Sequence, residues 1–181
     1  MTENIIIAGF GGQGVLSLGQ FLAYAAMYEN KEATWLPSYG PEMRGGTANC
    51  SLVISDKPIA SPVIETPDTL IALNKPSLDK FIDNVKTGGA VIVNSSIIKD
   101  KIERDDIKVI YLPANDVAAA AGSVKTANVV VLGAYIAATK LFSKESVRAT
   151  IEKIFKKKSN VIPMNLAAFE LGYAAIDKEC K

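Results

Sequence analysis

Residues 4–29 read NIIIAGFGGQGVLSLGQFLAYAAMYE, and this stretch decides the fold. The apolar run from Asn4 to Ala8 predicts a buried strand, and the Ala-rich stretch from Val15 to Glu29 predicts a helix. Between them, Gly9-Phe10-Gly11-Gly12-Gln13-Gly14 has the spacing G-x-G-x-x-G in the strand–turn–helix setting that gives this motif meaning. Glycines permit a tight turn and let backbone N–H groups approach a ligand, while the helix N-terminus favours an anion. The stretch therefore predicts a doubly wound α/β fold.

Short apolar runs alternate with helical patterns along the rest of the chain. Strands are predicted at Thr34–Leu36, Thr47–Ser55, Thr69–Asn74, Ala90–Asn94 and Lys108–Leu112. Helices are predicted at Ser77–Val85, Asn115–Ala121, Thr126–Phe142, Lys144–Lys157 and Pro163–Lys178. Apolar strands with helices between them indicate a mostly parallel sheet covered by helices on both faces. Because no repeat or linker divides the chain, we expect one Rossmann-like domain over residues 1–181.

Composition excludes several classes of protein. A hydrophobic content of 49% with 22% charged residues excludes intrinsic disorder, and a net charge of +1 argues against a dedicated nucleic-acid or membrane-surface binder. The chain has no His, which excludes imidazole acid–base catalysis and imidazole metal ligands. Cys50 and Cys180 cannot by themselves supply a four-thiolate metal site. Two thiols without a secretory signal indicate a cytoplasmic protein. From the absence of His and the small number of Cys, we expect no metal site and no catalytic residue on this chain.

The charge pattern and the cysteines receive structural interpretations. The run Lys156-Lys157-Lys158 closes an amphipathic pattern, so it is interpreted as cations at a helix C-terminus. Cys50 lies within an apolar run and is expected to be a small buried hydrophobic residue. The uncharged helical stretch 126–139 is too short to cross a membrane, which takes about 18 or more apolar residues.

The glycine turn leaves three interpretations open. A dinucleotide site needs an acidic residue at the end of the second strand to hold the ribose, about 20 positions further on. That strand ends at Trp35-Leu36-Pro37-Ser38, while Glu32 precedes it and Glu42 lies beyond it. A free-standing Rossmann dehydrogenase is therefore disfavoured. The turn either receives a phosphate or another anion from a different cofactor, or keeps its glycines for close packing and a partner surface.

The loop Pro37–Gly46, PSYGPEMRGG, is the least ordinary segment. Two prolines and three glycines in ten residues restrict its backbone, and into that backbone are set Tyr39, Glu42 and Arg44. The planar guanidinium of arginine suits two-point contact with a carboxylate or a phosphate. Glu42 and Arg44 either pair with each other to pin the loop, or the loop meets a cofactor or a partner subunit.

Three motifs together resemble the gamma subunit of the 2-oxoacid:ferredoxin (acceptor) oxidoreductases. They are GFGGQG at 9–14, SYGPEMRGGTANC at 38–50 and KTANVVVLGA at 125–134. The middle motif is the specific one, and the resemblance covers nearly the whole chain. Residues expected to contact a cofactor are Gly9, Gly11, Gly12, Gln13, Gly14, Tyr39, Glu42, Arg44, Gly45, Gly46 and Asn128.

The resemblance implies a role within a complex. Such enzymes oxidatively decarboxylate a 2-oxo acid, with 2-oxoglutarate favoured here, transfer the acyl group to coenzyme A and reduce ferredoxin or a similar acceptor. Thiamine diphosphate, magnesium and iron–sulfur clusters would lie in alpha, beta and ferredoxin-like delta subunits, while this chain would help to position coenzyme A. The chain lacks a cysteine-rich cluster motif and the thiamine-binding motif, so alone it should be inactive and form a homodimer. A scaffold subunit without a ligand is the remaining alternative.

Substitution of Arg44 separates the two interpretations of the loop. If Arg44 holds a phosphate or a partner carboxylate, Arg44→Lys keeps the charge but loses the two-point contact. Loss of a charge-assisted hydrogen bond of about 1.5–3 kcal/mol should then weaken coenzyme A use or subunit affinity roughly 10- to 150-fold in the complex. The melting temperature of the free chain should hardly change, because a surface pair contributes about 0–1 kcal/mol. If Arg44→Lys and Glu42→Gln instead lower that temperature and leave full activity, the two residues only hold their own loop together.

Overall fold

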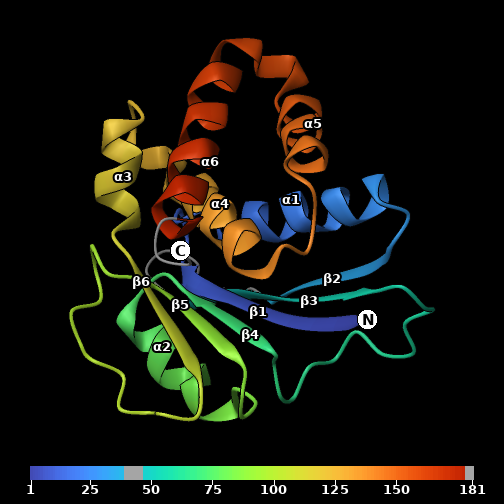
Figure 1. Cartoon of the computed structure of the whole chain (residues 1–181), viewed down its shortest axis with the longest axis vertical. Coiled ribbons are helices and arrows are strands. Elements are labelled where there is room, and N and C mark those ends of the chain that lie inside the picture. The colour runs from blue at the N-terminus through green and yellow to red at the C-terminus, as the bar shows by residue number, and fades with distance from the viewer. Residues whose placement is uncertain (39–46, 178–181) are drawn as a thin grey trace.

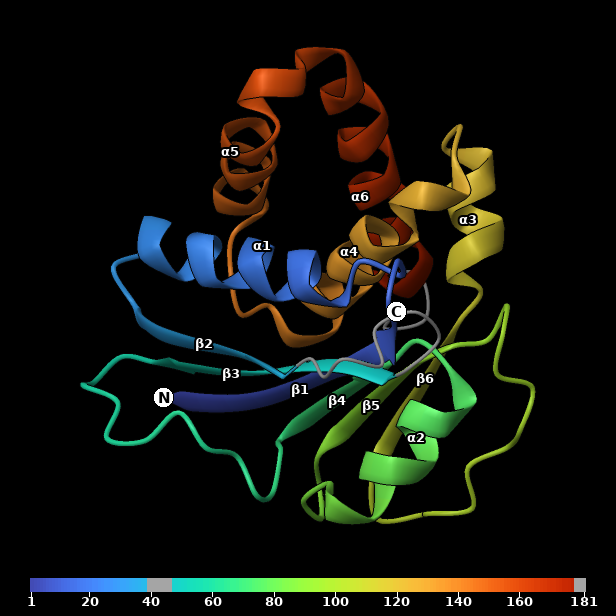
Figure 2. The ribbon, with the colours of Figure 1, turned by 180° about the vertical axis from the view of Figure 1, so that it is seen from behind.

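A six-stranded sheet lies at the centre of the molecule, with helices on both of its faces (Figures 1 and 2). The computed structural model describes residues 1–38 and 47–177. The strands are β1 (Thr2–Phe10), β2 (Glu32–Ser38), β3 (Thr47–Ser55), β4 (Thr69–Ala72), β5 (Ala90–Asn94) and β6 (Lys108–Leu112). The α-helices are α1 (Val15–Tyr28), α2 (Lys75–Phe81), α3 (Ala114–Ala120), α4 (Ala127–Thr139), α5 (Lys144–Ile154) and α6 (Ile162–Asp177). Three short 3-10 helices are η1 (Ile82–Asn84), η2 (Val124–Thr126) and η3 (Lys156–Val161).

The strand order is β2-β3-β1-β4-β5-β6. The pairings β1–β4, β4–β5 and β5–β6 are parallel, which places Ile7, Ile71, Ile92 and Ile110 side by side across four strands. The mostly parallel sheet expected from the sequence is therefore confirmed. At its edge, however, β3 runs antiparallel to both β1 and β2. The reason is chain length: eight residues separate Ser38 from Thr47, whereas a parallel crossover takes about a dozen or more.

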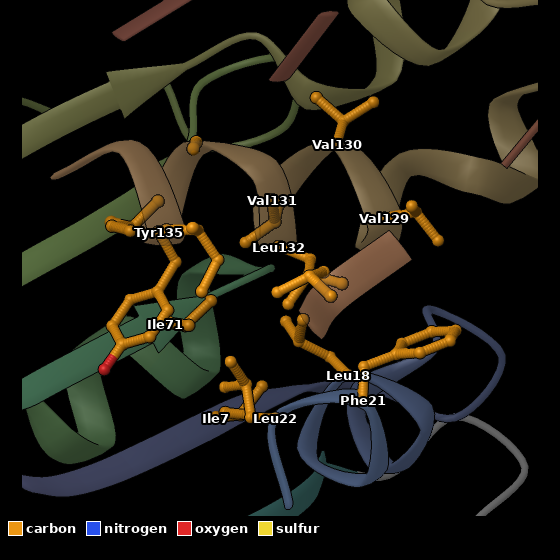
Figure 3. Packing of buried hydrophobic residues seen from close by; sticks show 14 of the residues in the cluster. Ile7, Leu18, Phe21, Leu22, Ile71, Val129, Val130, Val131, Leu132 and Tyr135 are labelled. Atoms are coloured by element: carbon orange, nitrogen blue, oxygen red, sulfur yellow. The ribbon is translucent and has the colours of Figure 1, made fainter. Parts of the chain in front are cut away.

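The two faces of the sheet bury different sets of side chains. On one face, residues of β1 and β4 such as Ile7 and Ile71 contact the apolar sides of α1 and α4 (Figure 3). Helix α4 is apolar on nearly its whole circumference, because α1, α3 and α6 surround it as well as the sheet. On the other face, Ile6 and Ala8 of β1 join the cluster around Leu78 of α2 and Val85. Among the described helices, none is long and apolar enough to cross a membrane.

Helices α5 and α6 form an outer layer that lies on α1 and α4 rather than on the sheet (Figures 1 and 2). The crossing of α4 and α6 is very close, because glycines stand at the point of contact. A Cβ atom on Gly133 would overlap the backbone carbonyl of Phe169, and one on Gly172 would overlap that of Val130. The glycine of the third sequence motif therefore serves helix packing.

Capping side chains and backbone angles explain where the observed elements differ from the predicted ones. The strand predicted to reach Asn74 stops at Ala72, because the Asn74 side chain caps α2 by accepting a hydrogen bond from Ser77 N at 2.9 Å. The helix predicted to reach Phe142 stops at Thr139, because Lys140 takes a left-handed φ of 52°. Ser143 caps α5, since its hydroxyl accepts a hydrogen bond from Ser146 N.

Gly133→Ala tests the close crossing of α4 and α6. In an ordinary helix interior this change stabilises by about 0.5–1 kcal/mol. Here the added methyl meets the backbone of α6, so we expect the free energy of unfolding to fall by about 1–3 kcal/mol or more. Gly172→Ala should show the same sign from the other side of the contact. Denaturant unfolding of both variants measures this, and a gain in stability in either would contradict the described crossing.

Candidate functional site

The glycine turn joins the end of β1 directly to the start of α1. Gly12 and Gly14 have φ angles of 93° and 76°, which favour glycine, and Gln13 N closes the turn on Phe10 O at 3.1 Å. Gly9 lies beneath the turn and is buried. A Cβ atom there would stand 2.8 Å from Gln13 Oε1 and 3.0 Å from Leu73 Cβ. Close packing thus requires Gly9, while the left-handed backbone requires Gly12 and Gly14.

Helix α1 begins without a side-chain cap. Its N-cap residue is Gly14, and its first turn contains no acidic residue. The first intrahelical bond runs from Leu18 N to Gly14 O, so the three N–H groups before Leu18 point out of the helix end. They face a hollow of about 300 Å³, which we call the α1 hollow, lined by Phe10, Gly11, Gly12, Gly14, Val15, Leu16, Ser17 and Ala48. The positive end of the helix dipole makes this hollow favourable for an anion.

A second helix begins beside the first. Thr126 is the N-cap of α4, but its hydroxyl donates to Ser123 O at 2.8 Å instead of capping the helix, and the first turn of α4 contains no acid. Asn128 Nδ2 donates to Gly14 O at 3.3 Å and so ties this helix end to the glycine turn. Lys125 lies in η2, which leads directly into α4. The Ser123 side chain caps η2 by accepting from Lys125 N, and Ala127 N–H bonds Val124 O, so this helix end is satisfied internally. The uncapped N-terminus of α1 and the charge of Lys125 are the features near the turn that favour an anion.

A cavity of about 220 Å³, which we call the amide pocket, lies at the carboxyl ends of the parallel strands. Its lining residues are Gly12, Gln13, Leu73, Asn94, Asn115, Val124, Lys125, Ala127 and Asn128. Helix α1 follows β1 on one face of the sheet and α2 follows β4 on the other, so the pocket adjoins the point where the direction of winding reverses. Ligands of open α/β sheets bind at such a point.

Asparagines are the functional candidates that the sequence analysis missed. Asn94 ends β5, and its Nδ2 donates to Asn115 Oδ1 of α3 at 3.1 Å. Asn74 follows β4 and touches the turn through Gln13. A signal was present, because Asn74 and Asn94 each end a predicted strand, and the carboxyl ends of parallel strands meet at one edge of a sheet.

Gln13 holds the turn in shape with its side chain. Its Oε1 accepts hydrogen bonds from Phe10 N at 2.6 Å and from Asn74 Nδ2 at 3.2 Å, and its Nε2 donates to Leu73 O at 3.1 Å. The side chain thereby connects the end of β1 to the end of β4. Since Asn74 also caps α2, the network links the turn to the helix on the opposite face of the sheet.

The described residues bring together only part of the predicted set. Gly9, Gly11, Gly12, Gln13, Gly14 and Asn128 all lie at the glycine turn or directly beside it. Tyr39, Glu42, Arg44, Gly45 and Gly46 lie outside the described residues. Cys50 is fully buried on β3, and burial raises the pKa of its thiol to about 12, which confirms its expected packing role.

Comparison with known proteins matches residues 4–175 to the family model of pyruvate ferredoxin/flavodoxin oxidoreductase. The chain belongs to this family. Over 170 residues it is 43% identical to the ketoisovalerate oxidoreductase subunit VorA of Methanothermobacter thermautotrophicus, covering 93% of this chain and 35% of that protein. Over 176 residues it is 39% identical to the 2-oxoglutarate synthase subunit KorC of Methanocaldococcus jannaschii, covering 96% of this chain and 93% of that protein. The chain thus spans about a third of the first relative and nearly all of the second.

Two solved structures of the family share the fold. The gamma subunit of a keto/oxoacid ferredoxin oxidoreductase from Geobacter sulfurreducens superposes with a TM-score of 0.83 at 30% identity, covering 96% of this chain and 98% of that one. The second is the 2-oxoglutarate:ferredoxin oxidoreductase of Magnetococcus marinus, solved with 2-oxoglutarate, coenzyme A and succinyl-CoA bound. It superposes with a TM-score of 0.89 at 25% identity. That match covers 98% of this chain and 31% of the other. In this family the fold therefore occurs both as a separate subunit and within a longer chain.

Gln13→Glu tests the hydrogen-bond network of the turn through its pH dependence. When protonated, the introduced carboxyl can donate to Leu73 O as the amide does; when ionised, it opposes that carbonyl. Its folded-state pKa should be raised, so the stability that remains at low pH is lost as the pH rises through that value. We expect a loss of about 1–3 kcal/mol at pH 7 and a smaller loss at pH 4.

The matched control is Gln20→Glu, which changes an exposed glutamine of the following helix, α1. It should show little change at either pH. Urea unfolding at both pH values compares the two variants. Equal behaviour of the two would show that Gln13 does not hold the turn.

Proposed function

We propose that this chain is the gamma subunit of a 2-oxoacid:ferredoxin oxidoreductase complex, in which its glycine turn positions coenzyme A. The observation that carries the proposal is the uncapped N-terminus of α1 at the glycine turn, with Lys125 beside that turn in the lining of the amide pocket. A helix end without a cap leaves N–H groups that need a partner, and an anion satisfies both their hydrogen bonds and their dipole. The anion here is a phosphate group of coenzyme A.

The two cavities suit different parts of that ligand. The α1 hollow offers helix N–H groups and the partly buried Phe10, which suits a phosphate joined to a nucleoside. The amide pocket offers Asn94, Asn115 and Asn128, whose side chains match the amide groups of the pantetheine arm. Bound coenzyme A in the relative from Magnetococcus marinus supports this assignment.

The role of the chain in the reaction is positioning. The reaction is the oxidative decarboxylation of a 2-oxo acid to its acyl-CoA with reduction of ferredoxin or a similar acceptor. Binding the phosphates far from the thiol fixes the thiol relative to the acyl group, which replaces an encounter in solution by a bound geometry. We favour 2-oxoglutarate as the substrate, because the match to the 2-oxoglutarate synthase subunit KorC covers 93% of that protein, whereas the match to the ketoisovalerate oxidoreductase subunit VorA covers 35%. We assign thiamine diphosphate, magnesium and iron–sulfur clusters to the alpha, beta and delta subunits, because the two cysteines of this chain are too few for a four-thiolate cluster.

An exposed apolar strip supports the partner subunits of the proposal. Tyr24, Met27 and Tyr28 on α1 and Leu36 on β2 are 37–63% exposed and lie at one edge of the sheet. A groove of about 330 Å³ runs among Gln20, Ala23, Tyr24, Met27 and Trp35. Surfaces of this kind are covered in permanent complexes. Without its partners the chain would associate with itself through them, and we place the whole complex in the cytoplasm.

Ser17→Asp tests the anion site of α1. An acid in the first turn favours the helix dipole, so the melting temperature of the free chain should stay the same or rise. The same charge repels a phosphate in the α1 hollow, so the KM for coenzyme A in the reconstituted complex should rise about tenfold or more. The assay uses 2-oxoglutarate, coenzyme A and a viologen acceptor, with Gln20→Asp as the control one turn further along α1.

Three results would contradict the proposal. The first is an unchanged KM in Ser17→Asp. The second is turnover of 2-oxo acids by the purified chain alone, which would make it a complete enzyme. The third is micromolar binding of NAD(H) in a calorimetric titration, which would favour a free-standing dehydrogenase, even though β2 ends without a ribose-binding acid at Ser38.

A further inference from the structure

The connection between α5 and α6 carries a cluster of lysines that the proposed site does not use. We call Lys153, Lys156, Lys157 and Lys158 the basic tip. They lie where the two helices join, at the end of the molecule farthest from the sheet (top of Figures 1 and 2). All four side chains are exposed. The tip is thus the most projecting part of the helical layer.

The nearly neutral total charge conceals a strongly uneven distribution. Residues 144–161 contain six Lys and Arg and two Glu, a net charge of +4. Since the whole chain carries +1, the remainder carries −3. A surface with this asymmetry produces a directed field that steers approaching molecules.

The fold does not require the run at 156–158. A cation in the last turn of α5 interacts favourably with the helix dipole, and Lys153 occupies that position. Its Nζ also lies 5.1 and 5.4 Å from the ring centroids of Tyr24 and Tyr28. The other three lysines follow the C-cap residue of α5 and precede the N-terminus of α6, whose dipole disfavours cations. None of the three has an ion pair with a residue of the described ranges 1–38 and 47–177. The sequence interpretation of Lys156–Lys158 as cations in the last turn of this helix is therefore wrong: α5 ends at Ile154, and Lys153 is the cation in its last turn.

We infer that the basic tip docks on an acidic surface of another protein subunit, an inference that rests on the proposed place of the chain in a complex. Lysines without fixed partners act as point charges and attract carboxylates over a distance. A nucleic acid or an anionic membrane would extend past the tip and meet the net-negative remainder of the chain. A folded protein can present carboxylates to the tip alone, so it is the partner that this charge distribution fits.

The test compares two triple variants that lose the same charge. Lys156→Gln, Lys157→Gln and Lys158→Gln together remove the tip, and Lys57→Gln, Lys101→Gln and Lys108→Gln together remove three exposed lysines elsewhere. Both should melt within about 2 °C of the natural chain, because surface changes of this kind have small effects. Association with the separately purified partner subunits is then measured at low and high salt.

We expect the tip variant to associate about tenfold or more slowly than the natural chain and the control at low salt. The difference should vanish near 1 M salt, where the screening length is about 3 Å. A carbodiimide should cross-link a peptide containing Lys156–Lys158 to an acidic peptide of a partner subunit.

The alternative outcomes separate the inference from the proposed function. Equal association of the tip variant and the control at every salt concentration would overturn the inference and leave the proposed function standing. The inference would also be overturned if the tip variant lost binding to a DNA duplex or to phosphatidylserine vesicles but kept its association with the partner subunits. If the natural chain associates with no 2-oxoacid oxidoreductase subunit, the proposed function is contradicted, and so is the inference that depends on it.

Discussion

The uncapped N-terminus of α1, held against the end of β1, is the constraint on which the rest of the structure depends. Gly12 and Gly14 turn the chain through left-handed angles, and Gly9 lets the turn lie close to Leu73, the residue that follows β4. The same glycines leave the helix end without a side-chain cap. One sequence feature therefore fixes the packing of α1 on the sheet and creates a place for an anion.

Much of the fold follows from local patterns, and what does not follow depends on distant contacts. Strands at 47–55, 90–94 and 108–112 were predicted with the observed bounds, because apolar β-type runs stand out between turn residues. The position of β3 between β1 and β2 could not be predicted, since hydrophobicity does not show which strands pair. The antiparallel direction of β3 relative to β2 could have been predicted, because eight residues between Ser38 and Thr47 are too few for a helical crossover.

The candidate site likewise combines features that follow from local sequence with features that depend on distant contacts. The glycine motif predicts its own turn, since backbone angle and spacing are local properties. Asn128 came from a family motif, and the structure supplies its geometric meaning, a hydrogen bond to Gly14 O across 114 positions. The link from Gln13 through Asn74 to α2 crosses the sheet and could not be read from spacing. The α1 hollow and the basic tip also lie on different elements, so the proposed coenzyme A binding and the inferred subunit docking can be tested by separate variants.

The central claim, that the glycine turn of this chain receives a phosphate group of coenzyme A, is most directly tested by amide NMR of the isotope-labelled chain titrated with coenzyme A. The account predicts saturable shifts of the backbone N–H signals of Gly11, Gly12 and the first turn of α1, and smaller shifts for Asn128. Pantetheine, which carries no phosphate, should leave the chemical shifts of the first turn of α1 unchanged. Shifts confined to the basic tip, or none at millimolar coenzyme A, would contradict the claim.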